Sequence, residues 1–223
     1  MSSTQEDIFW ETIEILNSQE VLDNLILIGS WAEYIYQAAN YYEGFRSNFR
    51  TMDLDFLIPN LRRPSKKVDL CAIMERHNFL TIQRPSDGLT KFSCGEGPLE
   101  IEFIARELGS GQTEPYKVES LGIKVEGLRH LNILSANTTL SLVRSYYISV
   151  PIPPAYVLHK LMINERRGIK KEKDLFAVEN LLGFIRRSDT ELSKLKEIFD
   201  SLTKKEKVMV VTTCKKNLIK LFD

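Results

Sequence analysis

The sequence lacks the features that mark membrane, secreted and zinc-binding proteins. Its three cysteines, Cys71, Cys94 and Cys214, lie far apart and form no CxxC pair, which argues against a disulfide framework and a zinc knuckle. We interpret them as packing thiols, because free cysteine is among the most buried residue types. No apolar run approaches the roughly 20 residues of a membrane span. The amino-terminal residues lack the basic and apolar regions of a signal peptide, so we expect a cytoplasmic protein without a membrane partner.

An excess of charge of either sign is also missing. The 223 residues include 30 Lys and Arg and 30 Asp and Glu, so the formal net charge is zero. We therefore expect no whole-molecule attraction to nucleic acid, and any site for a polyanion must be a local patch. The sequence contains no Gly-x-Ser-x-Gly elbow, Walker loop or dinucleotide fingerprint, which leaves hydrolase, kinase and oxidoreductase interpretations without residues to carry them.

The spacing of apolar residues predicts an α+β protein. A capping-box pattern in Ser3-Thr4-Gln5-Glu6 begins a helix that ends near Ser18. The run "LILI" predicts a strand that leads through Gly29-Ser30 into a second helix, and "MDLDFLI" predicts a strand that Pro59 stops. Further elements are predicted as a helix over 67–77 and strands over 79–83, 89–93, 99–104 and near 117–125 and 139–150, with "ANTT" as a loop.

The character of the sequence changes at "VPIPPAYVLHKLM". Closely spaced prolines break any sheet there, and Pro153 or Pro154 is well placed to open a helix in its first turn. From this point the pattern is helical, over 154–167, 172–187, 190–200 and 204–221. We therefore expect an α/β domain over residues 1–150 and an all-α domain over residues 151–223.

Two aspartates, Asp53 and Asp55, interrupt the apolar strand "MDLDFLI". Side chains two apart in a strand point to the same face, with α-carbons about 6.5 to 7 Å apart, so the two carboxylates converge. Such a pair resists desolvation unless a cation lies between its members, and hard oxygen ligands suit Mg²⁺ or Mn²⁺. The pair indicates a metal site. The alternative, open for any DxD, is that both aspartates face water.

Two other segments favour the metal site. In "ILIGSW" a glycine and a serine precede a helix, where amide groups, a hydroxyl and the positive helix end can bind an anion, although the same Gly-Ser also fits an ordinary turn. In "PLEIEFI", Glu100 and Glu102 alternate with apolar residues and would supply a third carboxylate from a neighbouring strand.

The order of these segments resembles the DNA polymerase β type nucleotidyltransferase superfamily. The shared order is a strand, Gly-Ser, a helix, a strand with DxD and a later acidic strand. The resemblance implies a mixed sheet with flanking helices, Gly29 and Ser30 gripping the triphosphate of an NTP, and Asp53 and Asp55 binding Mg²⁺ or Mn²⁺. It also implies a third acid that helps to hold one metal and activates the attacking hydroxyl. Either Glu102 or Glu100 fits, and the apolar flanks of "IEFI" favour Glu102.

A narrower resemblance comes from "FRTMDLDF" and "VLHKLMINERRGIKKEKDLFAVENLL". Both are similar to nucleotidyltransferases related to the type IV abortive-infection toxins. The similarity implies that Lys160 faces the triphosphate and that Lys173-Asp174 is a basic-acidic pair, with Asp174 across the cleft. It also implies a toxin role with an antitoxin partner. Ala177 stands where those relatives often have a second aspartate.

Several residues near these motifs have two interpretations. Lys160 either reaches a buried polyanion or snorkels at the rim of the helix interface. Arg50 and Thr51 either orient the metal carboxylates and contact nucleotide phosphate, or lie at the rim. A basic cluster could bind nucleic acid together, but individually its members fit a solvated loop: Arg166, Arg167, Lys170 and Lys171. The three histidines lack metal-ligand spacing and are interpreted as structural: His77, His130 and His159.

Taken together, these residues predict a metal-dependent nucleotidyltransferase that moves a nucleoside monophosphate from an NTP to a hydroxyl acceptor. An RNA 3′ end (tRNA in particular), a protein side chain and a small molecule such as an aminoglycoside all fit the same site. The basic helical part favours RNA or a toxin role. A nucleotide- or partner-binding module without turnover and a purely structural protein remain as alternatives.

Overall fold

A mixed β-sheet occupies the centre of the amino-terminal part. The computed structural model describes residues 4–222 except 48–51, 95–98, 110 and 112. Within these ranges the strand order is β1-β2-β5-β4-β3, and β7 pairs with both β5 and β6. The strands are β1 (Ile26–Ile28), β2 (Asp53–Ile58), β3 (Phe79–Gln83), β4 (Thr90–Cys94), β5 (Glu100–Arg106), β6 (Tyr116–Val118) and β7 (Ile123–Leu128).

The central strand β2 follows directly from its sequence. It runs parallel to β5 and antiparallel to β1, so strand neighbours protect both of its edges. Leu54 and Phe56 are fully buried, and the Phe56 ring stacks on Phe103 of β5 with ring centroids 5.6 Å apart. The other face of β2 carries the two aspartates, followed by the buried Leu57. The period of two thus separates an apolar side that anchors the strand from an acidic side.

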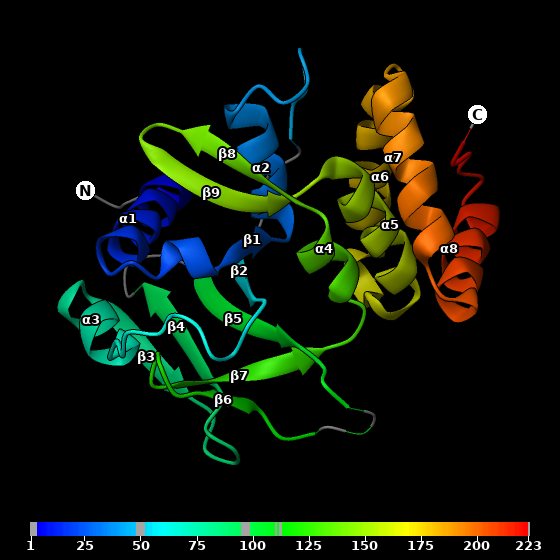
Figure 1. The fold of residues 1–223 in the computed structure, drawn as a ribbon. Coiled ribbons are helices and arrows are strands. Elements are labelled where there is room, and N and C mark those ends of the chain that lie inside the picture. Colours follow the sequence, from blue (N-terminus) through cyan, green and yellow to red (C-terminus); the bar gives the residue numbers. More distant parts are fainter. Residues whose placement is uncertain (1–3, 48–51, 95–98, 110, 112, 223) are drawn as a thin grey trace.

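Helices and a hairpin complete the amino-terminal part (Figure 1). The aromatic rings of Phe9 on α1 and Trp31 on α2 stack with centroids 4.3 Å apart, which fixes the two helices against each other. A two-stranded sheet lies beside them, with Tyr36 donating a hydrogen bond to the Pro151 carbonyl at 2.6 Å. These elements are α1 (Gln5–Ser18), η1 (Leu22–Asn24), α2 (Ser30–Ala38), α3 (Leu70–Arg76), α4 (Asn132–Ala136), β8 (Thr138–Val143) and β9 (Tyr146–Pro151).

Four longer helices gather beside the sheet and form the carboxy-terminal part (Figure 1). They are α5 (Pro153–Ile163), α6 (Lys171–Ile185), α7 (Asp189–Ser201) and α8 (Lys204–Lys216), with the short 3₁₀ turns η2 (Asn164–Arg166) and η3 (Gly168–Lys170) before α6. Residues 153–162 of α5 are all buried. A helix that is buried on every side belongs to a core rather than to a surface. This core nevertheless contains His159 and Lys160.

The α+β architecture and the order of its main elements are confirmed. Several details of the prediction were wrong, and the helix expected over 154–167 ends at Ile163. Thr4 and Asp7 form the capping box of α1, one residue later than expected, and the last helix ends at Lys216 rather than at 221. Thr138 and Thr139 of the expected "ANTT" loop begin β8, as suits β-branched residues, and the short α4 was not predicted because five residues show no helical period. The domain division at residue 151 remains a prediction.

The length and polarity of the helices decide whether any of them could cross a membrane. Among the described residues, no helix has both the length and the apolar character that crossing a bilayer requires.

Candidate active site

Four carboxylates meet on the acidic side of β2 and β5. In the parallel register Asp53 lies opposite Glu100 and Asp55 lies opposite Glu102. All four line one cavity, which we call the first cavity; it has a volume of about 630 Å³. Burial, together with the charges of Glu102 and Asp53, raises the pKa of Asp55 to about 6. The arrangement therefore concentrates negative charge that a bound cation would relieve.

Gly29 makes close approach to this cluster possible. Its φ of +69° lies in the left-handed region, and a Cβ added there would lie 2.7 Å from the Asp55 Oδ2. Only glycine therefore allows the turn between β1 and α2 to touch the carboxylate. Ser30 begins α2, and Gly29, at the N-cap position, offers no side chain to cap it. The amino-terminal end of α2, with its partial positive charge, can therefore face an anion.

Both candidates for the third acid contact Lys91, which was not a candidate from the sequence. Lys91 on β4 lies 2.5 Å from Glu102 Oε1 and 3.5 Å from Glu100 Oε2. Burial opposes its charge, but the hydrogen bond and the charge of Glu102 raise the pKa of Lys91 above its ordinary value. The two candidates for the third acid therefore share one lysine, whose single charge offsets only part of theirs.

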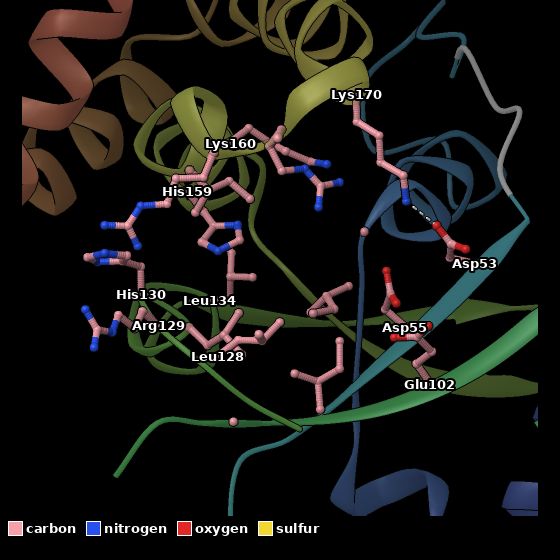
Figure 2. A pocket seen from close by; sticks show the side chains of 18 of the residues that line it. Asp53, Asp55, Glu102, Leu128, Arg129, His130, Leu134, His159, Lys160 and Lys170 are labelled. Atoms are coloured by element: carbon pink, nitrogen blue, oxygen red, sulfur yellow. Dashed lines mark hydrogen bonds and ion pairs between the residues drawn. The ribbon is translucent and has the colours of Figure 1, made fainter. Parts of the chain in front are cut away.

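Lys170 joins the helical part to the sheet. Its Nζ is 2.5 Å from Asp53 Oδ2, across 117 residues of sequence (Figure 2). The expectation of a solvated loop holds only in part for Lys170, whose side chain is 49% exposed. No local signal could have shown this contact, because it depends on how η3 docks against β2.

A buried ion cluster lies on the helical side. Lys160 Nζ is 2.7 Å from Asp174 Oδ1, and Arg167 Nε is 2.8 Å from Asp174 Oδ2. The Lys160 and Asp174 side chains are 5% and 4% exposed, so the snorkelling alternative for Lys160 was wrong. Burial alone would raise the pKa of Asp174, but the charges and hydrogen bonds of Lys160 and Arg167 hold it below its ordinary value. The sequence did not predict that Arg167 takes part.

A second buried contact links α2 to α5. The Tyr156 hydroxyl donates a hydrogen bond to Glu33 Oε1 at 2.5 Å, and Lys160 Nζ lies 5.3 Å from the centre of the Tyr156 ring. Glu33 is 4% exposed, and burial raises its pKa. This contact fixes the helix that begins at Ser30 relative to the buried lysine. Neither Glu33 nor Tyr156 was a candidate from the sequence.

Two cavities meet at these charged groups. A second cavity of about 740 Å³ is lined by Ser30 and Lys173, and also by six residues that it shares with the first: Gly29, Asp53, Asp55, Lys160, Arg167 and Lys170. The first cavity extends away from the acids towards Leu128, Arg129 and His130 (Figure 2). The two aspartates therefore lie where one bound molecule could meet another.

The structure thus brings together most of the residues chosen from the sequence. Asp174 lines the second cavity, Glu100 and Glu102 line the first, and the shared set contains the glycine, both aspartates and Lys160. Arg50 and Thr51 lie outside the described residues. The functional roles assigned to all of these residues remain predictions.

Comparison with known proteins decides the family. Residues 10–201 match the nucleotidyltransferase family. The chain belongs to this family. The expected superfamily is confirmed, whereas the narrower likeness to abortive-infection toxins remains a prediction.

Solved structures show the same fold in other nucleotidyltransferases. An antigenic nucleotidyltransferase-like protein from Paracoccidioides brasiliensis is similar, with a TM-score of 0.53 and 12% identity over 96% of this chain and 90% of that one. The antibiotic-resistance factor ANT(2″)-Ia is similar, with a TM-score of 0.50 and 12% identity over 98% of this chain and 95% of that one. A search of curated protein sequences finds no match.

The donor set of this nucleotidyltransferase suits a divalent ion only in part. Asp53 and Asp55 offer the hard oxygen ligands that Mg²⁺ and Mn²⁺ take. Within the ranges that the structure describes, no group of three or more His, Cys, Asp or Glu side chains is arranged to hold a metal. Glu102, the preferred third acid, is ion-paired with Lys91 in this structure. An incoming substrate phosphate would have to contribute further oxygens.

His159 gives the nucleotidyltransferase an acid-sensitive core. Burial, aided by the charge of Lys160, lowers the pKa of His159 to about 3 from 6.5. Above pH 6.5 both folded and unfolded chains carry a neutral imidazole. As the pH falls below 6.5 only the unfolded chain gains the proton, so stability is lost down to about pH 3, by about 1.4 kcal/mol per pH unit at most.

We therefore expect the melting temperature of a His159→Leu variant to fall less steeply than that of the wild type between pH 6.5 and 4. Scanning fluorimetry in a series of buffers measures both slopes. His77→Leu, at an exposed position, is the matched control and should keep the wild-type slope. Equal slopes for wild type and His159→Leu would show that the imidazole is charged in the folded protein.

Proposed function

We propose that this protein transfers a nucleoside monophosphate from an NTP to a hydroxyl acceptor, in a reaction that depends on Mg²⁺ or Mn²⁺. The observation that carries the proposal is the position of Asp53 and Asp55, which line both cavities and face the cations of the helical part. An acid pair between two binding spaces suits a reaction in which a phosphoryl group passes from one bound molecule to another.

The second cavity would bind the triphosphate. Gly29 and Ser30 present amides and a helix end to it, while Lys160, Lys173 and Arg167 supply positive charge. Burial and the charge of Lys160 lower the pKa of Lys173, so a polyanion between these two lysines would relieve their repulsion. The carboxylates around Asp55 repel one another in the same way. A nucleotide with its metal ion would reduce both repulsions.

Asp53 and Asp55 would hold the divalent ion. When bound, such an ion polarises the reacting phosphoryl oxygens and neutralises charge that develops on them. Glu102 is the preferred third acid, since it lies opposite Asp55 in the register and its charge contributes to the raised pKa of Asp55. A Glu102 carboxylate released from Lys91 could accept the proton of the attacking hydroxyl. Asp174 would orient Lys160 through the hydrogen bond between them.

The first cavity would receive the acceptor. An RNA 3′ end, tRNA in particular, is the acceptor that we favour, because Arg129, Arg166 and Arg167 line this cavity and can contact backbone phosphates. A protein side chain is the alternative. A toxin role with an antitoxin partner, and a cytoplasmic location, rest on the sequence interpretation alone.

A labelling experiment tests the proposal. The protein is incubated with Mg²⁺ and each α-labelled NTP, together with cellular RNA or with lysate protein, and the labelled fraction is identified. We expect RNA to be labelled by the wild type and not by Asp53→Ala. Label in protein would assign the other acceptor. Mg²⁺-dependent NTP binding without pyrophosphate release for any acceptor would favour the binding module.

Lys170 and a divalent ion compete for the same carboxylate, because Lys170 is hydrogen-bonded to Asp53. We expect Lys170→Ala to bind Mn²⁺ several-fold more tightly than the wild type in the absence of nucleotide. Calorimetric titration with Mn²⁺ measures the change. Lys171→Ala is the matched control, since Lys171 lines neither of the two cavities. Weaker Mn²⁺ binding by Lys170→Ala would contradict the competition.

A further inference from the structure

Two exposed apolar side chains stand at the second cavity, beside its charged lining. Ile169 is 99% exposed and Met52 is 54% exposed, and both line this cavity. They belong to separate parts of the chain, Met52 just before β2 and Ile169 within η3. Each directly precedes a member of the Lys170–Asp53 ion pair, so this hydrogen bond between η3 and β2 brings them to the same region.

The second cavity is therefore divided by polarity. Its charged part contains three lysines and Arg167 together with the aspartates Asp53, Asp55 and Asp174, and its apolar part is formed by Met52 and Ile169. A single exposed apolar side chain needs no explanation. Two such side chains beside four basic residues and the two proposed metal ligands match a ligand with a metal-bound polyanionic end and a flat, weakly polar end, and a nucleoside triphosphate has this form.

We propose that Met52 and Ile169 clamp the nucleobase of the bound NTP, one from the sheet and one from the helical part. The inference rests on the proposed function and extends it to the base. Covering the two side chains with a base removes apolar surface from water, which favours binding.

The clamp has a consequence for specificity. Met52 and Ile169 have no hydrogen-bonding groups that read a base edge, so they contact only the faces, which all four bases share. They would hold any NTP, and purines more firmly than pyrimidines because a purine covers more area.

Calorimetric binding of two probes tests the clamp. ATP and inorganic tripolyphosphate, each with Mg²⁺, are titrated into wild type, Met52→Ala, Ile169→Ala and the double variant. Val208→Ala is the matched control, since Val208 is 64% exposed on α8 and lines neither cavity. All replaced side chains are more than half exposed, so the variants should melt like the wild type.

We expect each single variant to bind ATP about 3- to 10-fold more weakly, the double variant to be weakest, and tripolyphosphate affinity to stay within about twofold. Ile169→Trp should tighten ATP binding, because a flat ring stacks on a base, and should leave tripolyphosphate unchanged. Unchanged ATP affinity in the double variant, or an equal loss for both probes, would overturn the clamp alone. Failure of the wild type to bind either probe would overturn the proposed function and the clamp with it.

Discussion

Asparagine in place of Asp55 is expected to reduce nucleotide transfer by a factor on the order of 10³ and, at neutral pH without divalent ions, to raise the melting temperature. The loss of transfer follows from the position of Asp55 between the two cavities and from its proposed contact with the metal. The gain in stability follows from its surroundings, because Glu102 and Asp53 repel its charge and burial removes water from it.

The sign of the stability effect can be derived from the pKa of Asp55. The pKa rises from 3.8 to about 6 on folding, so the unfavourable ionisation is absent below pH 3.8 and complete above pH 6. At pH 7 the folded chain therefore carries a penalty on the order of 1 to 3 kcal/mol, which the neutral amide avoids. A bound cation would remove the same penalty from the wild type. Mg²⁺ should thus raise the melting temperature of the wild type more than that of Asp55→Asn.

Two measurements check this expectation. Transfer from α-labelled NTP gives the activity, and scanning fluorimetry between pH 4 and 8, with and without Mg²⁺, gives the stability. Asp200→Asn serves as the control, because the Asp200 side chain is 79% exposed on α7. Full activity of Asp55→Asn would remove Asp55 from the proposed site. A lower melting temperature at pH 7 would show that its charge is already compensated.

The second large effect concerns the buried ion cluster. Asp174→Asn should lower the free energy of unfolding by about 3 to 5 kcal/mol, because Lys160 would then be buried without a negative partner. Lys160→Met should cost less, since Asp174 keeps its hydrogen bond from Arg167. The loss is larger for Asp174→Asn because Asp174 has two cationic partners, Lys160 and Arg167.

Urea unfolding of the two variants and of Lys160→Met/Asp174→Leu measures these losses. The double variant removes both buried charges and should recover most of the stability, because Arg167 is 34% exposed and can turn towards solvent. It should still fail to transfer nucleotide if Lys160 binds phosphate. A larger loss for Lys160→Met than for Asp174→Asn would show that the cluster depends mainly on the lysine.

Local patterns predicted the strand and the turn that carry the candidate site. The alternation in β2 placed Asp53 and Asp55 on one face, and the structure pairs that strand with β5, which carries Glu100 and Glu102. Gly29 was chosen as a residue that allows close approach, and the structure places Asp55 where a Cβ would lie. Such features depend on a few consecutive residues, so backbone geometry and side-chain period suffice to predict them.

The charge partners were not predictable in the same way. Lys91 on Glu102, Lys170 on Asp53 and Arg167 on Asp174 come from segments interpreted as an ordinary strand and a solvated loop. A lysine or arginine in the sequence gives no sign of which carboxylate it will meet, because the long side chain reaches in several directions. The docking of neighbouring segments decides the choice.

The sequence by itself determined which groups could do chemistry here: a glycine-serine turn, two convergent aspartates, a further acid and a lysine within an apolar helix. Only the tertiary structure decided how their charges are balanced and where the bound molecules would lie. The reason is physical. Strand period and helix propensity act between near neighbours, whereas the burial of Lys160, the crowding around Asp55 and the meeting of two cavities at the aspartates depend on contacts between segments far apart in the chain.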